Sequence, residues 1–376
     1  MKRTGKWELY NYTNIAVINL FMKKKFIFYI HSTAGLVSGL FILLMSLSGA
    51  ALVFHEDMDS IQQPEFNVKD YNTLTLDSAY SDLRERFPYA QINSCRLPLN
   101  KETVFAFSVY DPSYKNGKKM MEMYFHPQTG GFLGTRGGSD DMENNFMSWL
   151  SKFHNSFHLG KTGEWLLGFF ALVFVLSIIT GLILFRKNIV PVLLFKRSVY
   201  KKNNLHQRIG VYALLFNLMI AVTGFWMQRY VFKKEFYVAD NYTPVLRATP
   251  ALPFNFDTAY MGIQKKYPDF TAHVVYFAQS NAGKTAVYGS RSSNAYIHSK
   301  KFADAIFLDS SGSIAKTRFV NEISADDRYD IINSQLHMGR FGGTWIKIVY
   351  FLFGLTGALL SITGFLLWVR RRKEKK

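Results

Sequence analysis

Two histidines of this sequence have the same neighbours at the same distances. His31 is followed after 4 residues by Gly35 and after 18 residues by Gly49, and His206 is followed by glycines at both of these distances. Each histidine begins an apolar segment, where an ionisable side chain is costly to bury and indicates a functional site. Neutral imidazoles are common ligands of iron and other transition metals. The repeated spacing therefore makes both histidines candidate ligands.

A second pair of histidines has another spacing that also occurs twice. His154 precedes Gly181 by 27 residues, and His337 precedes Gly364 by 27 residues. A serine or threonine stands directly before the later glycine in four apolar segments, at Ser48, Thr180, Thr223 and Thr363. Hydrogen bonding to lipid headgroups or backbone carbonyls is the alternative interpretation of all four histidines, but such contacts require no matched spacing.

Four long windows without charged residues carry these patterns. They are Phe26–Phe54, Trp165–Phe185, Ile209–Gln228 and Ile348–Val369. Each window holds about 20 residues or more, which is enough to cross about 30 Å of hydrocarbon as an α-helix. The sequence therefore predicts an integral membrane protein built on a bundle of four transmembrane helices.

Lysine and arginine are concentrated in short segments at the ends of the predicted spans. Residues 186–208 contain seven of them and no acid, and residues 370–376 contain six beside one Glu. Short basic loops remain in the cytoplasm, so we expect both chain ends and the central loop there. Residues 55–150 carry fourteen acids and nine bases, so we place the long segments on the opposite side. The net charge of +18 then reflects membrane orientation, and no nucleic-acid partner is expected.

The sequence lacks the patterns of several other cofactor sites. It contains no Walker loop, Rossmann glycine fingerprint or Cys-x2-Cys pair, so it gives no argument for a nucleotide, flavin or iron–sulfur site. Its single cysteine, Cys95, has no partner for an intrachain disulfide. The apolar run after residues 23–25 is too long for a cleavable signal and lacks a small-residue cleavage site, so we expect an uncleaved anchor.

The two long segments between the spans have the same predicted order of elements. Apolar residues at helical spacing predict a helix at Leu76–Phe87 and a matching one at Phe256–Tyr267. β-rich runs separated by turn residues follow the first helix, at Thr103–Tyr110 and Met120–Phe125. Residues 306–318 align with residues 124–136. The chain therefore reads as an internal parallel duplication of helix, α+β domain and helix.

This plan divides the chain into nine segments. They are a cytoplasmic N-terminal segment at 1–22, transmembrane helix 1 at 23–55, an α+β domain at 56–150, transmembrane helix 2 at 151–187, a cytoplasmic loop at 188–205, transmembrane helix 3 at 206–230, a second α+β domain at 231–335, transmembrane helix 4 at 336–370 and a cytoplasmic tail at 371–376.

A pseudo-two-fold axis along the membrane normal sorts the histidines into pairs. It brings His31 to His206 at the cytoplasmic ends of their helices, and His154 to His337 at the outer ends. Two facing neutral imidazoles suit one iron centre at each level.

Gly35 and Gly210 lie one helical turn from their histidines. They either leave room for a flat macrocycle or allow close packing of helices.

These residues resemble the PepSY-associated transmembrane family, whose members include bacterial inner-membrane ferric-siderophore reductases. The resemblance covers roughly residues 23–372 and rests on the two His-x3-Gly starts, the Ser/Thr-Gly helix ends, FHNSFHLG at 153–160 and LHMGRFGG at 336–343. Both α+β segments resemble PepSY domains, which implies a bacterial inner-membrane protein with two periplasmic domains.

The resemblance implies two b-type haems, each held by two histidines, that carry electrons outward to ferric iron bound to a siderophore or similar chelate. On this mapping His31 and His206 hold the cytoplasmic-side haem, and His154 and His337 hold the outer one. His158 departs from the family pattern, which has an apolar residue there, so the choice between His154 and His158 stays open. The electron donor, a cytoplasmic reductant or a quinol, is not identified by the sequence.

A second class of function remains compatible with the sequence. A transporter or sensor would bind an iron-related ligand with its α+β domains and use the helices to move it or to signal, without redox chemistry. A split α-band in the optical spectrum of the reduced protein distinguishes the haem protein from this alternative.

Overall fold

The computed structural model describes residues 5–62, 66, 74–98, 103–111, 120–197, 204–237, 248–278, 283–292 and 301–374, with side chains from residue 24 onward. The chain forms two compact units. The helical unit consists of residues 1–51, 159–233 and 348–376, and the sheet unit consists of residues 52–158 and 234–347.

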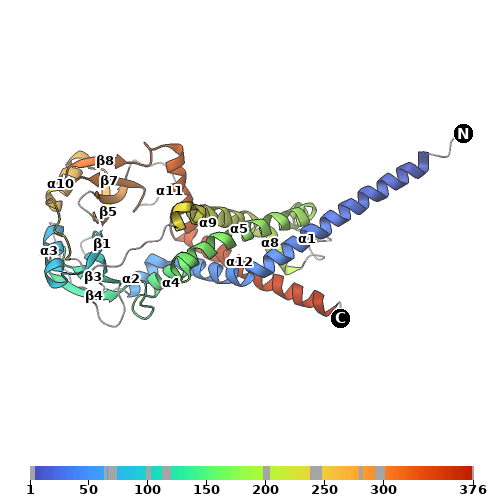
Figure 1. Cartoon of the computed structure of the whole chain (residues 1–376), viewed down its shortest axis with the longest axis horizontal. Helices are drawn as coiled ribbons and strands as arrows, with labels where there is room; N and C mark the ends of the chain where they lie inside the picture. The colour runs from blue at the N-terminus through green and yellow to red at the C-terminus, as the bar shows by residue number, and fades with distance from the viewer. Residues whose placement is uncertain are drawn as a thin grey trace. The chain divides into compact units, whose positions relative to one another are not determined.

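The helical unit contains the long apolar helices. Its main helices are α1 (Gly5–Leu52), α5 (Gly160–Phe185), α8 (Leu205–Tyr212), α9 (Leu214–Gln228) and most of α12 (Thr344–Lys373) (Figure 1). Among the described residues three segments are long and apolar enough to cross a membrane, at Lys24–Leu52, Gly160–Leu193 and Thr344–Lys373. Leu205–Tyr212 and Leu214–Phe232 give a fourth if this pair, bent by 68°, is counted as one span.

The predicted third span, 206–230, is therefore broken between α8 and α9. No proline lies at the break. The side-chain amide of Asn217 donates to the carbonyl of Ala213 at 3.1 Å and to Oγ1 of Thr356 at 3.0 Å. A side chain that bonds a helical carbonyl four residues earlier competes with the helix ladder and bends it. The apolar pattern alone gives no sign of this bend.

In two further predicted spans, the long apolar helix begins later than expected, at Gly160 and Thr344. The predicted helix 151–187 is divided into α4 (Phe146–Ser156) and α5, and the predicted helix 336–370 into α11 (Ala325–Met338) and α12. Phe157 and His158 follow α4 with φ of 50° and 58°, and Gly339 follows α11 with φ of 66°. Residues in the left-handed conformation end a helix. His154 and His337 consequently lie in the last turns of α4 and α11.

Several shorter elements connect these helices. They are α2 (His55–Gln62), η2 (Arg186–Asn188), α6 (Ile189–Leu193), η3 (Arg229–Phe232) and η4 (Lys234–Tyr237).

In the described residues, the sheet unit is built on one antiparallel sheet of eight strands in the order β4-β3-β2-β1-β5-β6-β7-β8. The strands are β1 (Gln91–Arg96), β2 (Phe105–Tyr110), β3 (Met120–Phe125), β4 (Phe132–Gly137), β5 (Phe270–Tyr276), β6 (Thr285–Arg291), β7 (Asp304–Leu308) and β8 (Ile314–Arg318). β1 pairs with β5 through Cys95 opposite Val275. Two four-stranded halves of the same element order thus share one sheet.

Two helices cover one face of this sheet, α3 (Leu76–Arg86) and α10 (Phe256–Lys266) (Figure 1). They coincide closely with the two helices expected from apolar spacing. Leu83 and Ile263 of these helices belong to the same buried core as Phe107 of β2 and Val287 of β6. The free thiol of Cys95 is buried in this core. Burial of these apolar side chains from both halves stabilises the joined sheet.

The two covering helices cap one another. The carboxylate of Asp257 accepts hydrogen bonds from the backbone N–H groups of Leu76 and Asp77, at 2.9 and 3.3 Å. The carboxylate of Asp77 accepts from the N–H groups of Phe256 and Asp257, at 2.9 and 2.8 Å. Burial and the neighbouring charge of Asp77 raise the pKa of Asp257 to about 6, although its backbone hydrogen bonds oppose this. Each helix N-terminus thus receives a carboxylate from the other half of the unit.

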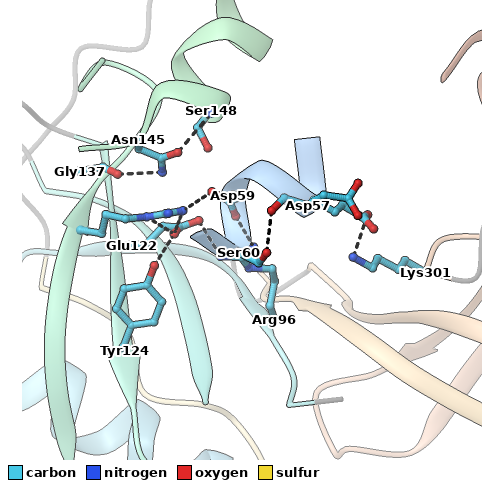
Figure 2. Close-up of polar contacts among 12 residues, drawn as sticks. Asp57, Asp59, Ser60, Arg96, Glu122, Tyr124, Gly137, Asn145, Ser148 and Lys301 are labelled. Carbon is cyan, nitrogen blue, oxygen red and sulfur yellow. Dashed lines mark hydrogen bonds and ion pairs between the residues drawn. The ribbon is translucent and has the colours of Figure 1, made fainter. Parts of the chain in front are cut away.

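The opposite face of the first half carries a buried network of charges (Figure 2). The guanidinium of Arg136, which is 3% exposed, pairs with Asp59 of α2 at 2.7 Å and with Glu122 of β3 at 2.8 Å. Glu122 also accepts from Arg96 at 2.8 Å and from the hydroxyl of Tyr124 at 2.7 Å. This network holds α2 on β1, β3 and β4, because breaking a buried ion pair leaves an uncompensated charge.

Candidate functional site

The helical unit brings His31 of α1 and His206 of α8 together. Their ring centroids lie 6.3 Å apart, with 66° between the ring planes. A metal ion about 2 Å from one nitrogen of each of two facing imidazoles holds the ring centroids roughly 6 Å apart. The separation of the two rings therefore matches that of two ligands on one metal.

Hydrogen bonds on α5 hold the ring of His31. Its Nδ1 lies 2.9 Å from the carbonyl oxygen of Ser177 and 3.2 Å from Oγ1 of Thr180. The Thr180 hydroxyl donates its own proton to the carbonyl of Leu176 at 2.8 Å. Both groups beside Nδ1 can then only accept, so Nδ1 carries the imidazole proton. The neutral ring is left with its lone pair on Nε2, the nitrogen available to a metal.

His206 has the same arrangement on α12. Its Nδ1 lies 3.1 Å from the carbonyl oxygen of Leu360 and 3.1 Å from Oγ1 of Thr363. The Thr363 hydroxyl donates to the carbonyl of Leu359 at 2.6 Å. The lone pair of this ring is therefore also on Nε2. A proton donated by the remote nitrogen to a carbonyl is the usual support of a metal-bound histidine.

The glycine of each Thr-Gly pair makes room for the histidine that the threonine holds. A Cβ at Gly181 would lie 3.0 Å from Cε1 of His31, and a Cβ at Gly364 would lie 3.3 Å from Cε1 of His206. Sequence reasoning found the two Thr-Gly pairs but did not predict their contact with His31 and His206. It had connected them by spacing with His154 and His337. Antiparallel neighbouring helices bring the end of one beside the start of the other, which is the signal that could have connected them correctly.

Gly35 and Gly210 are less tightly placed. A Cβ at Gly35 would meet Oγ of Ser177 at 3.8 Å, and one at Gly210 would meet Cδ2 of Leu360 at 3.8 Å. These are ordinary contact distances, so close packing of the helices does not demand glycine at either position. Room for a flat group beside the histidines remains the other interpretation.

His154 and His337 lie in the sheet unit, on the last turns of α4 and α11. Burial, and to a smaller extent the positive charge of His337, lower the pKa of His154 to about 3. This is an electrostatic interaction between the last turns of α4 and α11. A neutral imidazole is the form that binds a metal.

His158 lies just after α4 and has a different environment. Its ring stacks on Trp149 with 4.8 Å between centroids. Its Nε2 is buried and has no hydrogen-bond partner among the residues that the structure describes. The charge of His337 is not among the causes that lower the pKa of His158, which are led by burial and Lys152. The pairing of His154 with His337, and the choice between His154 and His158, stay predictions from the sequence.

Each predicted histidine pair offers two ligands. Within the described ranges no group of three or more His, Cys, Asp and Glu side chains could hold a metal ion. Protein sites for bare ions use about four or more ligands. A haem brings four equatorial nitrogens of its own and takes two axial ligands from the protein, and two is the number each histidine pair offers.

Comparison with known families gives one match over most of the chain. The family model described as PepSY-associated TM region matches residues 28–371. A search of curated proteins finds no match.

Proposed function

Because this chain belongs to the PepSY-associated TM family of membrane proteins, we propose that it is a haem-containing oxidoreductase of the bacterial inner membrane. In this proposal it passes electrons across the membrane and reduces ferric iron that is bound to a siderophore or a similar chelate in the periplasm. Two b-type haems are its cofactors, one at each histidine pair.

The observation that carries this proposal is the environment of His31 and His206. Thr180 and Thr363 orient both rings, fix the proton on Nδ1 and leave Nε2 for a metal. A haem bound there supplies an iron that takes up and releases one electron. The only cysteine is buried Cys95, and covalent attachment of haem requires a Cys-x2-Cys-His sequence. The cofactor is therefore held by the histidines alone, as in b-type sites.

The charge distribution supports the direction of transfer. Basic residues 186–208 and 370–376 remain in the cytoplasm with both chain ends. The sheet unit then lies in the periplasm, and the two halves of the chain form a parallel duplication with four transmembrane helices. Electrons enter from a cytoplasmic reductant or a quinol and leave near His154 and His337.

The substrate is reduced outside the apolar spans. A bulky polar iron chelate does not enter hydrocarbon cheaply, so it approaches the sheet unit from the aqueous side. One electron converts ferric to ferrous iron, a softer ion for which hard oxygen ligands have lower affinity. Release of the iron follows from this change.

The proposal is tested with the full chain in detergent and in sealed proteoliposomes. We expect a reduced spectrum with the split α-band of two haems, and reoxidation of dithionite-reduced protein by a ferric chelate added outside. A colourless protein purified from haem-replete cells contradicts the proposal and favours a transporter or sensor. A haem protein that external ferric chelates do not reoxidise retains the cofactor but is not a ferric reductase.

A further inference from the structure

The two halves of the sheet differ at one pair of corresponding positions. In the first half Arg136 of β4 lies opposite Glu122 of β3. In the second half Arg318 of β8 lies opposite Ala305 of β7. On the next strand, Ser108 of β2 lies opposite Glu122 in the first half. Tyr288 of β6 lies opposite Ala305 in the second half. The second half thus keeps the arginine but replaces its carboxylate with a methyl group.

Within the described residues, this replacement removes the carboxylate that would lie opposite Arg318. Arg136 forms ion pairs with Asp59 and Glu122. Arg318 forms no ion pair in the part of the chain that the structure describes, and its Nε is buried without a hydrogen-bond partner there. Its guanidinium lies over the ring of Tyr288, with Cζ 5.6 Å from the centroid. A buried guanidinium N–H without an acceptor is costly, and an anion would remove that cost.

Other aromatic rings pack around Tyr288, the ring that Arg318 contacts. Tyr276 of β5 meets Tyr288 edge to face at 5.4 Å between centroids, and the Tyr276 side chain is 36% exposed. Phe302 and Phe307 lie 6.2 and 6.4 Å from Tyr288. The first half has serine at the position of Tyr288 and glutamate at the position of Ala305, so the stacking of the arginine on a tyrosine ring is confined to the second half.

We propose that Arg318, with Tyr276 and Tyr288, binds an anionic ligand that carries aromatic rings, namely a catecholate-type ferric chelate. This inference rests on the proposed function, because it names the class of chelate that the reductase accepts. Catecholate complexes of a trivalent ion are negatively charged and expose planar rings with paired oxygens. A guanidinium recognises paired oxygens with two N–H groups, and tyrosine rings stack on planar ligands. Hydroxamate complexes are uncharged and have no rings, so this surface favours them less.

The test separates binding from electron transfer. Gallium(III) forms the same complexes as ferric iron but is not reduced, so calorimetric titration of the full chain measures binding alone. We expect the gallium complex of a hexadentate tris-catecholate to bind more tightly than gallium citrate or a gallium tris-hydroxamate. Arg318→Gln should weaken catecholate binding by about tenfold or more, as loss of a charge-assisted hydrogen bond does. Tyr288→Leu should weaken it as well.

Lys265→Gln is the matched control, because it removes an equal charge from an exposed position on α10. It should leave the affinity unchanged, and circular dichroism should show every variant folded. Equal affinities of wild type and Arg318→Gln for the catecholate complex would overturn the site. Binding of gallium citrate as tight as that of the catecholate would overturn the aromatic part of the inference. Catecholate binding that depends on Arg318 in a haem-free protein overturns the proposed reductase function and retains the site.

Discussion

At the scale of single residues, each histidine pair should hold its own haem. His31→Ala or His206→Ala should remove one haem and spare the other, because the two pairs lie in different units. His154→Ala or His337→Ala should remove the second. Haem content per chain and the optical spectrum of each component measure this, with His126→Ala on a turn of the sheet unit as the control. Loss of the outer haem in His158→Ala but not in His154→Ala would reassign that ligand, and unchanged haem in all five variants refutes the cofactor.

Thr180 and Thr363, beside His31 and His206, should affect the reduction potential of the haem iron and not the binding of the haem. The haem at His31 and His206 is called the inner haem. Thr363→Val removes one acceptor from Nδ1 of His206 and keeps the carbonyl of Leu360. A weaker hydrogen bond makes the imidazole a poorer electron donor, which favours ferrous iron. We expect haem content to stay and the reduction potential of the inner haem to rise by about 20–40 mV, the equivalent of one hydrogen bond.

Ser361→Ala is the control for Thr363→Val. Ser361 lies on the same helix, and its hydroxyl donates to the carbonyl of Gly357. Redox titration followed by the α-band should give an unchanged potential for this variant. An unchanged potential in Thr363→Val as well would show that the threonine plays no part in tuning the iron.

The proximity of His31 and His206 could be predicted from spacing, but the residues that support their rings could not be assigned. A repeated interval within one chain is visible in the sequence. The contact of Thr180 with His31 joins residues 149 positions apart, and it depends on how neighbouring helices pack. The left-handed residues Phe157 and His158 that end α4 were likewise not visible in the apolar spacing.

At the scale of elements, the cross-capped helices α3 and α10 should make the sheet unit sensitive to pH. The pKa of Asp257 in the folded chain is about 6, above the ordinary value of 3.8. The folded state therefore binds this proton more tightly than the unfolded state, and stability falls as pH rises from about 4 to about 6. After allowance for solvent screening of this partly exposed group, we expect a loss of about 1 kcal/mol.

The thermal unfolding midpoint of the full chain between pH 4 and pH 7.5 measures this effect. Asp257→Asn should remove the part of the pH dependence that centres between pH 4 and 6, because an amide does not titrate. Asp326→Asn, in the first turn of α11, is the matched control and should keep it. The same pH profile in wild type and Asp257→Asn would rule out the aspartate pair as its source.

Element types were largely predictable, and element ends were not. The apolar windows and the helices α3 and α10 follow from local periodicity. The break between α8 and α9 lies beside the side-chain amide of Asn217, which bonds both Ala213 and Thr356, and the bond to Thr356 is a tertiary contact. The pairing of β1 with β5 is also a tertiary contact, because the sequence of a strand does not determine which other strand it pairs with.

At the scale of the whole molecule, the proposed orientation determines the direction of electron flow. The net charge of +18 is concentrated outside the sheet unit, in the basic segments 186–208 and 370–376 and around residues 23–25. These segments resist transfer across the inner membrane, so the chain ends should face the cytoplasm. In intact spheroplasts, epitope tags at either end should be shielded from antibody and protease. Added protease should cut instead within 60–145 or 240–330, and a tag exposed after permeabilisation provides the control. If those two segments are protected while the tags are cleaved, the orientation is reversed, and electrons cannot leave on the periplasmic side.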